Sequence, residues 1–408
     1  MKMLLSLAWR NIWRNGRRSL LTISAIVFAT WLSVVMRGMQ LGTYRSNIEN
    51  AVRMFSSYAQ IQRSGYQKNP TLQLSFPYDA SILKRVGETP SIEATAPRIY
   101  ADGLVSLRDI SQGAFLIGVD ALREAHVTSL EKRLQRGRFP TTGSHEVALG
   151  TKLLANLKAE VGDRLVVLAQ GADGSLGNEF FTISGILRSG SPQMDATAMV
   201  MDLYDAQELL GMDGRIHALA MSLTRLEDIP YVQEQLKSKI SEDGLTVLSW
   251  KELMPEMDQM IKMDDASGVI FLAILVLIVA FGILNTVLMS VTERFREFGV
   301  LLSMGMPSFK LIAVVLLEVC FMTLVGITAG NVLGACVNWY LVQHPIFFGA
   351  EFGELYEQFG FLPRLDSTLD PGIFISTTLS IFVVSILSAM YPLVRLHQLE
   401  PLKGMRYT

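Results

Sequence analysis

The sequence predicts an α-helical membrane protein with four transmembrane helices, one before and three after a large extracytoplasmic α+β domain. Four long apolar runs carry almost no charge, whereas the region between the first and second runs is rich in charged and turn-forming residues. Charged residues make up 18% of the 408 residues, below the roughly 25% of an average soluble domain. Together these observations indicate a membrane protein with a sizeable water-soluble part.

The predicted segments follow from the apolar runs. Each run is long enough to cross a bilayer core of about 30 Å at roughly 1.5 Å per helical residue. In chain order, we expect an interfacial cytoplasmic helix (residues 1–18), a first transmembrane helix with its stalk (19–42), an outer α+β domain (43–266), a second transmembrane helix (267–292), a cytoplasmic amphipathic helix (293–308), a third transmembrane helix (309–342), an outer loop (343–371), a fourth transmembrane helix (372–396) and a cytoplasmic tail (397–408).

The first segment combines aliphatic and basic side chains with Trp9 and Trp13. This pattern is typical of an amphipathic helix in the membrane interface, where tryptophan rings lie at headgroup depth. The uncharged run at 19–36 exceeds the apolar core of a signal peptide, and no small-x-small cleavage site follows it before Arg37. We therefore expect a retained transmembrane helix.

The outer region alternates short apolar stretches with Gly, Pro, Asn and Asp, which is typical of strands mixed with short helices. The predicted strands are 114–119, 146–149, 164–169, 180–187, 198–201, 219–223 and 245–248. The predicted helices are 42–55 continuing the first span, 78–86, 152–157, 203–210, 231–241 and 250–263. A region of this length can bury a core of its own.

The segment 285–306, NTVLMSVTERFREFGVLLSMGM, joins the second apolar run to the third. Its charged residues are Glu293, Arg294, Arg296 and Glu297. A short amphipathic helix that ends at a glycine between two spans lies at the membrane surface and offers a face to a soluble partner. The pattern does not name that partner, and a simple cytoplasmic loop fits it equally.

This segment resembles the ER-x-RE-[FI]-G-x-L-x-x-[ML]-G signature of the MacB/LolE/FtsX-like permeases of ABC transporters. The residues assigned to it are Glu293, Arg294, Arg296, Glu297, Phe298, Gly299, Leu301, Met304 and Gly305. In that family the segment is the coupling helix that docks on the ATPase subunit. The resemblance therefore implies that these residues couple the chain to a cytoplasmic ATPase.

The resemblance extends over nearly the whole chain. Residues 146–187, with EVALGTKLL, VGDRLVV and FTISGIL, are similar to the periplasmic domain of the family, which identifies 43–266 as a MacB-like domain. Residues 391–406 are similar to the family's closing segment, with matches at Pro392 and Pro401. One span, a large outer domain and then three spans is the layout of the family.

The resemblance implies a permease subunit that works with a cytoplasmic ABC ATPase dimer and a second permease copy, identical or homologous. ATP and Mg²⁺ would be bound by the ATPase, and no cofactor by this chain. A stand-alone permease with a large outer domain is closest in layout to the lipoprotein-releasing LolC/LolE group. That layout implies extraction of lipoproteins from the outer leaflet of the inner membrane and release to a periplasmic chaperone. Export of peptides or drugs with a periplasmic adaptor and a membrane sensor or signalling subunit are alternatives.

Methionines gather on both sides of the outer domain. Met254, Met257, Met260 and Met263 recur every third residue, and Met36 and Met39 end the first span. Methionines at helical spacing are most often ordinary core residues. A soft, adaptable surface for a lipid-bearing substrate is the alternative, with Met36, Met39, Met260 and Met263 as its candidate residues.

Two features of the third apolar run need an interpretation. Glu318 is an ionisable residue inside the run, which makes it a functional candidate, but its position shortly after Lys310 favours pairing at the cytoplasmic end. Gly326, Gly330 and Gly334 repeat every fourth residue and let another helix approach closely. We expect this stripe to serve helix packing.

The distribution of charge predicts the topology. Lys and Arg concentrate before the first span, between the second and third, and after the fourth, whereas 343–371 is acidic. The positive-inside rule then places both termini and 293–308 in the cytoplasm and the large domain in the periplasm. With the resemblance, this predicts a multi-pass protein of the bacterial inner membrane, in contact with membrane lipids. Arg37 and Arg45 oppose the rule, but a large translocated domain weighs little in it.

Several function classes are disfavoured. The net charge of −2 gives no basic balance for nucleic acid. No G-x-x-x-x-G-K-[ST] or H-E-x-x-H motif occurs, and the five histidines are scattered singly, so we predict no catalytic residues, no metal site and a non-enzymatic subunit. Cys320 and Cys336 lie in an apolar segment, where we expect buried packing residues rather than a disulfide.

Overall fold

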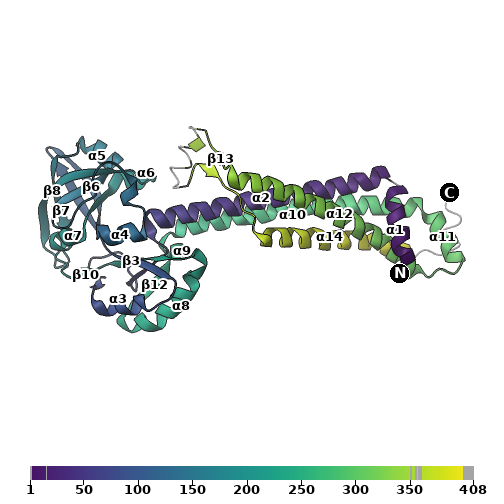
Figure 1. Ribbon diagram of the computed structural model, residues 1–408, viewed down its shortest axis with the longest axis horizontal. Helices are drawn as coiled ribbons and strands as arrows, with labels where there is room; N and C mark the ends of the chain where they lie inside the picture. Colours follow the sequence, from purple (N-terminus) through teal and green to yellow (C-terminus); the bar gives the residue numbers. More distant parts are fainter. Residues whose placement is uncertain (1, 15, 350–351, 354–355, 357–360, 398–408) are drawn as a thin grey trace. The chain divides into compact units, whose positions relative to one another are not determined.

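The computed structural model describes residues 2–14, 16–349, 352–353, 356 and 361–397 (Figure 1). The chain forms two compact units. The helical unit comprises Met1–Tyr44, Ile261–Ile346 and Arg364–Thr408, and the α+β unit comprises Arg45–Met260 and Phe347–Pro363.

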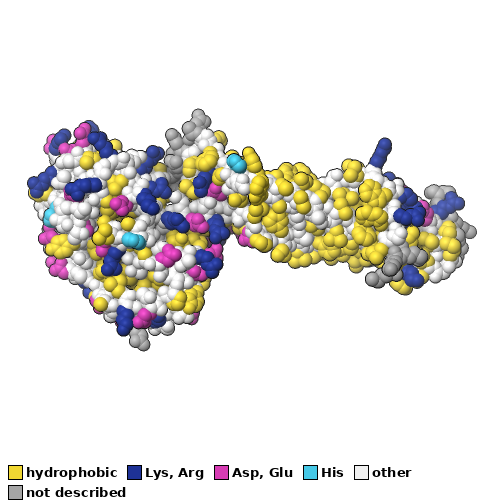
Figure 2. Space-filling model, in the orientation of Figure 1, with side chains coloured by type: hydrophobic (Ala, Val, Ile, Leu, Met, Phe, Trp, Pro, Cys, Tyr) yellow, Lys and Arg dark blue, Asp and Glu magenta, His cyan; other side chains and the backbone are white. Residues whose placement is uncertain are grey.

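Long helices dominate the helical unit. They are α1 (Lys2–Arg14), α2 (Gly16–Ala51), α10 (Pro255–Glu293), α11 (Phe295–Ser303), α12 (Ser308–Gln343) and α14 (Pro371–His397). Four of the helices, α2, α10, α12 and α14, are long and apolar enough to cross a membrane, as the sequence predicts. Hydrophobic side chains cover them, whereas acidic and basic side chains are frequent on the α+β unit (Figure 2). Apolar surface of this extent is unfavourable in water and is accepted by lipid tails.

Close packing joins α2 to α12. Gly326, Gly330 and Gly334 of α12 lie directly against Ile26, Thr30 and Val34 of α2, so that a Cβ on any of these glycines would fall within 2.7 Å of the opposing side chain. This contact confirms the packing role predicted for the glycine stripe. Cys320 is half-buried on the same helix, but Cys336 is exposed, so the expectation of a buried packing residue was wrong there.

The core of the helical unit lies among the spans. On α10 the buried residues recur every fourth position, and those from Val279 onward pack against apolar residues of α12 and α14. These α10 residues are Leu275, Val279, Ile283, Val287 and Val291. The remaining faces of α10 are largely exposed within this chain.

The α+β unit is organised around a ten-stranded sheet. Its strands are β1 (Ala59–Arg63), β3 (Ile92–Leu107), β4 (Ile110–Val119), β5 (Leu134–Gly137), β6 (Glu146–Gly150), β7 (Arg164–Gln170), β8 (Leu176–Leu187), β9 (Ala198–Asp202), β11 (Ala218–Leu223) and β12 (Leu245–Ser249). The order is β12-β1-β11-β3-β4-β9-β6-β8-β5, with β7 pairing β3 and β8. Most neighbours are antiparallel, but β4–β9 and β6–β8 are parallel.

Short elements complete the chain. The helices of the α+β unit are α3 (Ala80–Gly87), α4 (Ala121–Val127), α5 (Thr151–Leu157), α6 (Pro192–Thr197), α7 (Leu203–Leu210), α8 (Ile229–Ile240) and α9 (Trp250–Leu253). The two-residue strands are β2 (Phe76–Pro77), β10 (Arg215–Ile216), β13 (Ile346–Phe347) and β14 (Arg364–Leu365). Side-chain caps begin several helices; for example, the Asp79 carboxylate accepts the backbone N–H groups of Ser81 and Ile82 at the start of α3.

All seven predicted strands are present, but two predicted helices are not single elements. The expected helix at 42–55 is divided between α2, which ends at Ala51, and a π-helix at Val52–Ser56. The expected helix at 250–263 divides into α9, which ends at Leu253, and α10, which begins at Pro255. Met254 leaves the helical conformation with φ −127° and ψ 65°. Proline disfavours helical geometry in the residue before it, which explains the break.

Candidate functional site

The segment between α10 and α12 folds as the short helix α11. Its end is defined by Gly305, which has φ +90°, a conformation that glycine adopts without steric cost. The Met306 N–H donates to the Leu301 carbonyl and the Gly305 N–H to the Leu302 carbonyl, both at 3.0 Å. This pair of bonds is a Schellman motif, which ends α11 before Pro307 starts the turn into α12.

One face of α11 belongs to the interior of the helical unit. Phe298 is 2% exposed and joins the core formed by α10, α12 and α14. Gly299 is also buried, and Leu301 is half-buried against the same core. These residues therefore fix α11 to the spans.

The acidic residues on either side of this face pair with arginines near the N-terminus. Glu297 Oε2 lies 2.9 Å from Arg14 Nη2, and Glu293 Oε1 accepts a hydrogen bond from Arg18 Nη2 at 2.6 Å. Burial raises the pKa of Glu297, but the hydrogen bonds and charges of Arg14 and Arg294 outweigh it and hold the pKa below its ordinary value. Both pairs are well exposed, so each contributes little to stability and weakens with salt.

A cluster of largely buried polar side chains joins α1, the start of α11 and α12. Arg294 is 9% exposed, and its Nη1 donates to Glu318 Oε1 at 2.9 Å. The same carboxylate oxygen accepts a hydrogen bond from Asn11 Nδ2 of α1 at 2.5 Å. The Arg294 guanidinium also lies 5.1 Å from the ring centroid of Phe298. The predicted pairing of Glu318 is therefore confirmed, with Arg294 and Asn11 as its partners.

The opposite face of α11 is open. Arg296 is exposed, Val300 is 44% exposed and Met304 is 70% exposed. Just beyond the turn, Phe309 and Lys310 at the start of α12 are exposed as well. Among the described residues, Arg296 and Lys310 make no ion pair. The open face of α11 thus combines the apolar Val300 and Met304 with one cation, Arg296, and a second cation, Lys310, lies at the start of α12.

The residues predicted to couple to an ATPase thus divide into three groups. Arg294, Phe298 and Gly299 are buried and Leu301 is half-buried; Glu293 and Glu297 are exposed but paired; Arg296, Met304 and Gly305 are exposed. Whether they couple to an ATPase stays a prediction. Asn11, Arg14 and Arg18 were not predicted as partners of these residues. The sequence did contain a signal for these ion pairs, because arginines lie next to the first apolar run and glutamates next to the second.

A second polar cluster joins α2 and α10 at the other end of the helical unit. Arg37 Nη1 lies 2.5 Å from Asp265 Oδ1, and Gln40 Nε2 donates to the Asp264 carbonyl at 2.9 Å. The Tyr44 hydroxyl donates to the Asp264 carboxylate. This cluster gives Arg37, which opposes the positive-inside rule, a local charge partner.

The four methionines predicted to contact substrate are exposed or half-buried. Met36, Met260 and Met263 are exposed, and Met39 is half-buried. None of the four is a buried core residue of this chain, although methionines at helical spacing commonly are. Their role in binding stays a prediction.

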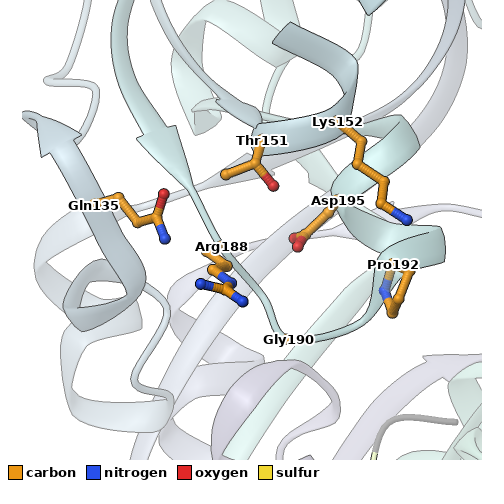
Figure 3. A pocket seen from close by; sticks show the side chains of 7 residues that line it. All are labelled: Gln135, Thr151, Lys152, Arg188, Gly190, Pro192 and Asp195. Carbon is orange, nitrogen blue, oxygen red and sulfur yellow. The ribbon is translucent and has the colours of Figure 1, made fainter. Parts of the chain in front are cut away.

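A cavity of about 310 Å³ opens on the α+β unit (Figure 3). It is lined by Gln135, Thr151, Lys152, Arg188, Gly190, Pro192 and Asp195. The Asp195 carboxylate already accepts the N–H and the hydroxyl of Ser189, both at 2.7 Å, and so holds a turn. The lining contains no nucleophile–base pair of the kind that acyl or glycosyl transfer needs.

Known proteins resemble this chain over nearly its full length. Residues 19–239 match the MacB-like periplasmic core domain, and residues 269–401 match the C-terminal domain of FtsX-like permeases. The lipoprotein-releasing system transmembrane protein LolC of Neisseria meningitidis is 21% identical over 406 residues, which cover 97% of this chain and 96% of LolC.

Two MacB comparisons differ in extent. The macrolide export ATP-binding/permease protein MacB of Nitrosomonas europaea is 23% identical, over 91% of this chain and 58% of MacB. The crystal structure of the periplasmic region of MacB from Actinobacillus actinomycetemcomitans has a TM-score of 0.36 and 13% identity, and the match covers 53% of this chain and 97% of that structure.

The MacB-like match alone covers more than half of the chain, and the FtsX-like match accounts for most of the rest. The segment that forms α11 falls within the second match. The chain therefore belongs to the MacB/FtsX-like permeases of ABC transporters.

Proposed function

We propose that this chain is the non-catalytic membrane subunit of an ABC transporter and that the open face of α11 docks a cytoplasmic ATPase. The observation that carries the proposal is the two-faced character of α11, with Phe298 buried among the spans and Met304 open. Arg296, Val300 and Met304 are exposed and follow one another at four-residue spacing, which fits a protein surface that offers an apolar pocket with an acidic rim.

The contacts of α11 with other helices would transmit a displacement of α11 to the spans. Its inner face packs with α10, α12 and α14, and the ion pair of Glu297 with Arg14 reaches α1, while that of Glu293 with Arg18 joins the end of α10 to α2. A push on the open face by the ATPase would therefore displace several helices together. Helices that act as levers must be closely packed, and the glycine contacts between α2 and α12 provide such packing.

The proposed setting is the bacterial inner membrane, with one crossing before the α+β unit and three after it. Both termini and α11 would lie in the cytoplasm and the α+β unit in the periplasm. The positive-inside distribution of Lys and Arg supports this orientation. ATP and Mg²⁺ would be bound by the partner ATPase, since this sequence has no phosphate-binding P-loop.

The proposed substrates are lipoproteins taken from the outer leaflet and passed to a periplasmic chaperone. The similarity to LolC over 97% of this chain and 96% of LolC supports this choice. The exposed Met36, Met260 and Met263, with the half-buried Met39, are the proposed apolar contacts for lipid chains. A second permease copy would complete the transporter. Drug or peptide export is the second candidate, because a MacB exporter also matches 91% of this chain.

The test is affinity purification of the tagged full-length protein from its native membrane in mild detergent, followed by mass spectrometry. We expect an ABC ATPase, a second permease copy and lipoproteins to co-purify. Met304→Asp should reduce the recovered ATPase about tenfold, because it places a charge at the centre of the apolar contact. Leu122→Asp, at an exposed leucine of α4 in the α+β unit, is the matched control and should leave recovery unchanged.

The outcomes separate the parts of the proposal. If no ATPase accompanies the wild-type protein, the proposed role as an ABC subunit is wrong. Equal recovery with Met304→Asp and Leu122→Asp would reject the docking face. A periplasmic adaptor in place of lipoproteins would favour export.

A further inference from the structure

Glu318 connects two helices that approach α12 from different parts of the chain. Its Oε1 accepts from Asn11 of α1 and from Arg294 at the start of α11. The residues of the first contact are separated by 307 positions in the sequence and those of the second by 24. One carboxylate thus links the N-terminal helix and the candidate docking helix to the third span.

The ion pair between Arg294 and Glu318 is far more buried than the ion pairs near it. The side chains of Arg294 and Glu318 are 11% and 9% exposed, whereas those of Arg14 and Glu297 are both about half exposed. Water and salt screen the exposed pair but not the buried one. Loss of Glu318 would leave the buried Arg294 guanidinium with only its longer ion pair to the exposed Glu297, at 3.4 Å, which is unfavourable for a buried charge.

The packing of α1 supports the same connection. Ala8 and Ile12 of α1 are buried, and the ring of Trp9 lies 5.8 Å from that of Phe321 on α12. The apolar contacts hold α1 against α12 without fixing its register closely, because dispersion contacts are not directional. The directional bond from Asn11 to Glu318 supplies that register.

We propose that Glu318 is a positioning residue that fixes α1 and α11 against α12, so that a load on α11 reaches all three helices together. The proposal rests on the docking of an ATPase on α11. In addition to its predicted role as an interfacial membrane helix, α1 would then take part in coupling by holding α11 in position. The side chain acts through Arg294 and Asn11 and touches neither nucleotide nor substrate.

The test compares full-length variants in complex with the co-purified ATPase, reconstituted in lipid. Glu318→Ala should leave the amount of bound ATPase and the KM for ATP unchanged but lower kcat about tenfold, because the helix still docks and no longer transmits motion. Glu318→Gln keeps the side-chain volume and an acceptor oxygen, which protects folding, and should lower kcat by a smaller factor.

The matched control is Asn338→Ala on the same helix. Asn338 is also fully buried and donates to the Val34 carbonyl of α2 at 3.0 Å, but it lies about 30 Å along α12 from Glu318. A purely structural role for buried polar residues of α12 predicts equal losses of kcat in the two variants. Equal losses, or a wild-type kcat in both Glu318 variants, would overturn the proposal.

Amide hydrogen exchange of the protein without ATPase gives a readout that does not depend on docking. Glu318→Ala should accelerate exchange in both α1 and α11, and Asn11→Ala in α1 alone. Unchanged exchange in the Glu318→Ala protein would reject the positioning role even if kcat fell. If the wild-type protein binds no ATPase, the proposed function fails, and the exchange result still decides whether Glu318 positions the two helices.

Discussion

At the scale of single residues, His217 shows how the α+β unit accommodates a buried polar ring. The residue is 0% exposed and its ring stacks on Tyr66 at 5.0 Å between centroids. Nδ1 lies 3.1 Å from the Tyr100 backbone N–H and must accept its hydrogen, so Nε2 carries the proton and faces the Leu72 carbonyl at 3.3 Å. Burial lowers the pKa of His217 to about 4.

This pKa predicts a pH-dependent stability of the α+β unit. Between about pH 6.5 and pH 4 the unfolded chain binds a proton at His217 that the folded protein does not bind, so the free energy of unfolding decreases as the pH falls through this window. The contribution of His217 should amount to roughly 3 kcal/mol over the whole window. His217→Gln should therefore lie closer to the wild type in stability at pH 4.5 than at pH 7.

The measurement is urea unfolding of the full chain in detergent, read by pulse proteolysis of the α+β unit at each pH. His126→Gln is the control, because His126 is exposed. A stability difference between His217→Gln and the wild type that stays constant with pH would contradict the assignment of a neutral buried imidazole.

At the scale of elements, the contact between α2 and α12 is set by glycines on both helices. Besides the stripe on α12, Gly38 of α2 lies against the Asn338 side chain, and Gly42 lies against the backbone of Ser367. The Thr368 N–H donates to the Gly38 carbonyl at 3.1 Å, which ties the segment before α14 to the same face of α2. A Cβ at Gly38 or at Gly42 of α2 would therefore force these neighbours away from α2.

Gly330→Ala should destabilise the helical unit. A Cβ at this position would lie 2.5 Å from the Thr30 Cβ and 2.8 Å from the Val27 carbonyl oxygen, so the helices must move apart. Overpacking of this kind costs about 1–3 kcal/mol. The melting temperature in detergent, followed by helix circular dichroism, should fall.

Gly282→Ala on α10 is the matched control for this change. No atom lies within 4 Å of a Cβ at Gly282, and alanine favours the helix over glycine by about 1 kcal/mol. The melting temperature of Gly282→Ala should therefore stay the same or rise. Equal melting temperatures for the Gly330 variant and the wild type would show that the α2–α12 contact is looser than described.

At the scale of the whole molecule, the proposed orientation places the two ends of the third span in different compartments. The polar cluster of Arg37 with Asp265 would then lie at the periplasmic end of the spans, and the cluster of Glu318 at the cytoplasmic end. In this orientation the charged side chains of both clusters lie near the ends of the apolar helices and outside the centre of the hydrocarbon core.

Cysteine labelling tests this orientation. In a Cys320→Ala, Cys336→Ala background, Tyr204→Cys on the α+β unit and Lys310→Cys at the start of α12 both offer exposed thiols. A membrane-impermeant maleimide added to intact spheroplasts should label position 204 and spare position 310. Permeabilisation should make both positions reactive. Labelling of position 310 in intact spheroplasts would reverse the predicted topology.

Several strands could not be predicted from local pattern. β3 runs for 16 residues, but it contains Pro97 and Gly103, which argue against a central strand. β1 carries Gln60 and Gln62, which suggest an exposed segment, yet both are buried and Gln62 donates to Gln60 at 2.9 Å. Pairing of β1 between β11 and β12 decides this burial, and it depends on residues far away in the chain.

The sequence by itself determined the four apolar helices, the seven predicted strands and the position of α11, because each depends on local periodicity, on composition or on the Gly305 turn. Only the tertiary structure decided which charges of α11 face inward and that Asn11 and Arg294 share the carboxylate of Glu318. A pattern of charged residues predicts whether the pairing side chain is acidic or basic, but it does not identify which residue that is. The partner is fixed by the packing of helices, which for Asn11 and Glu318 brings together residues 307 positions apart in the sequence.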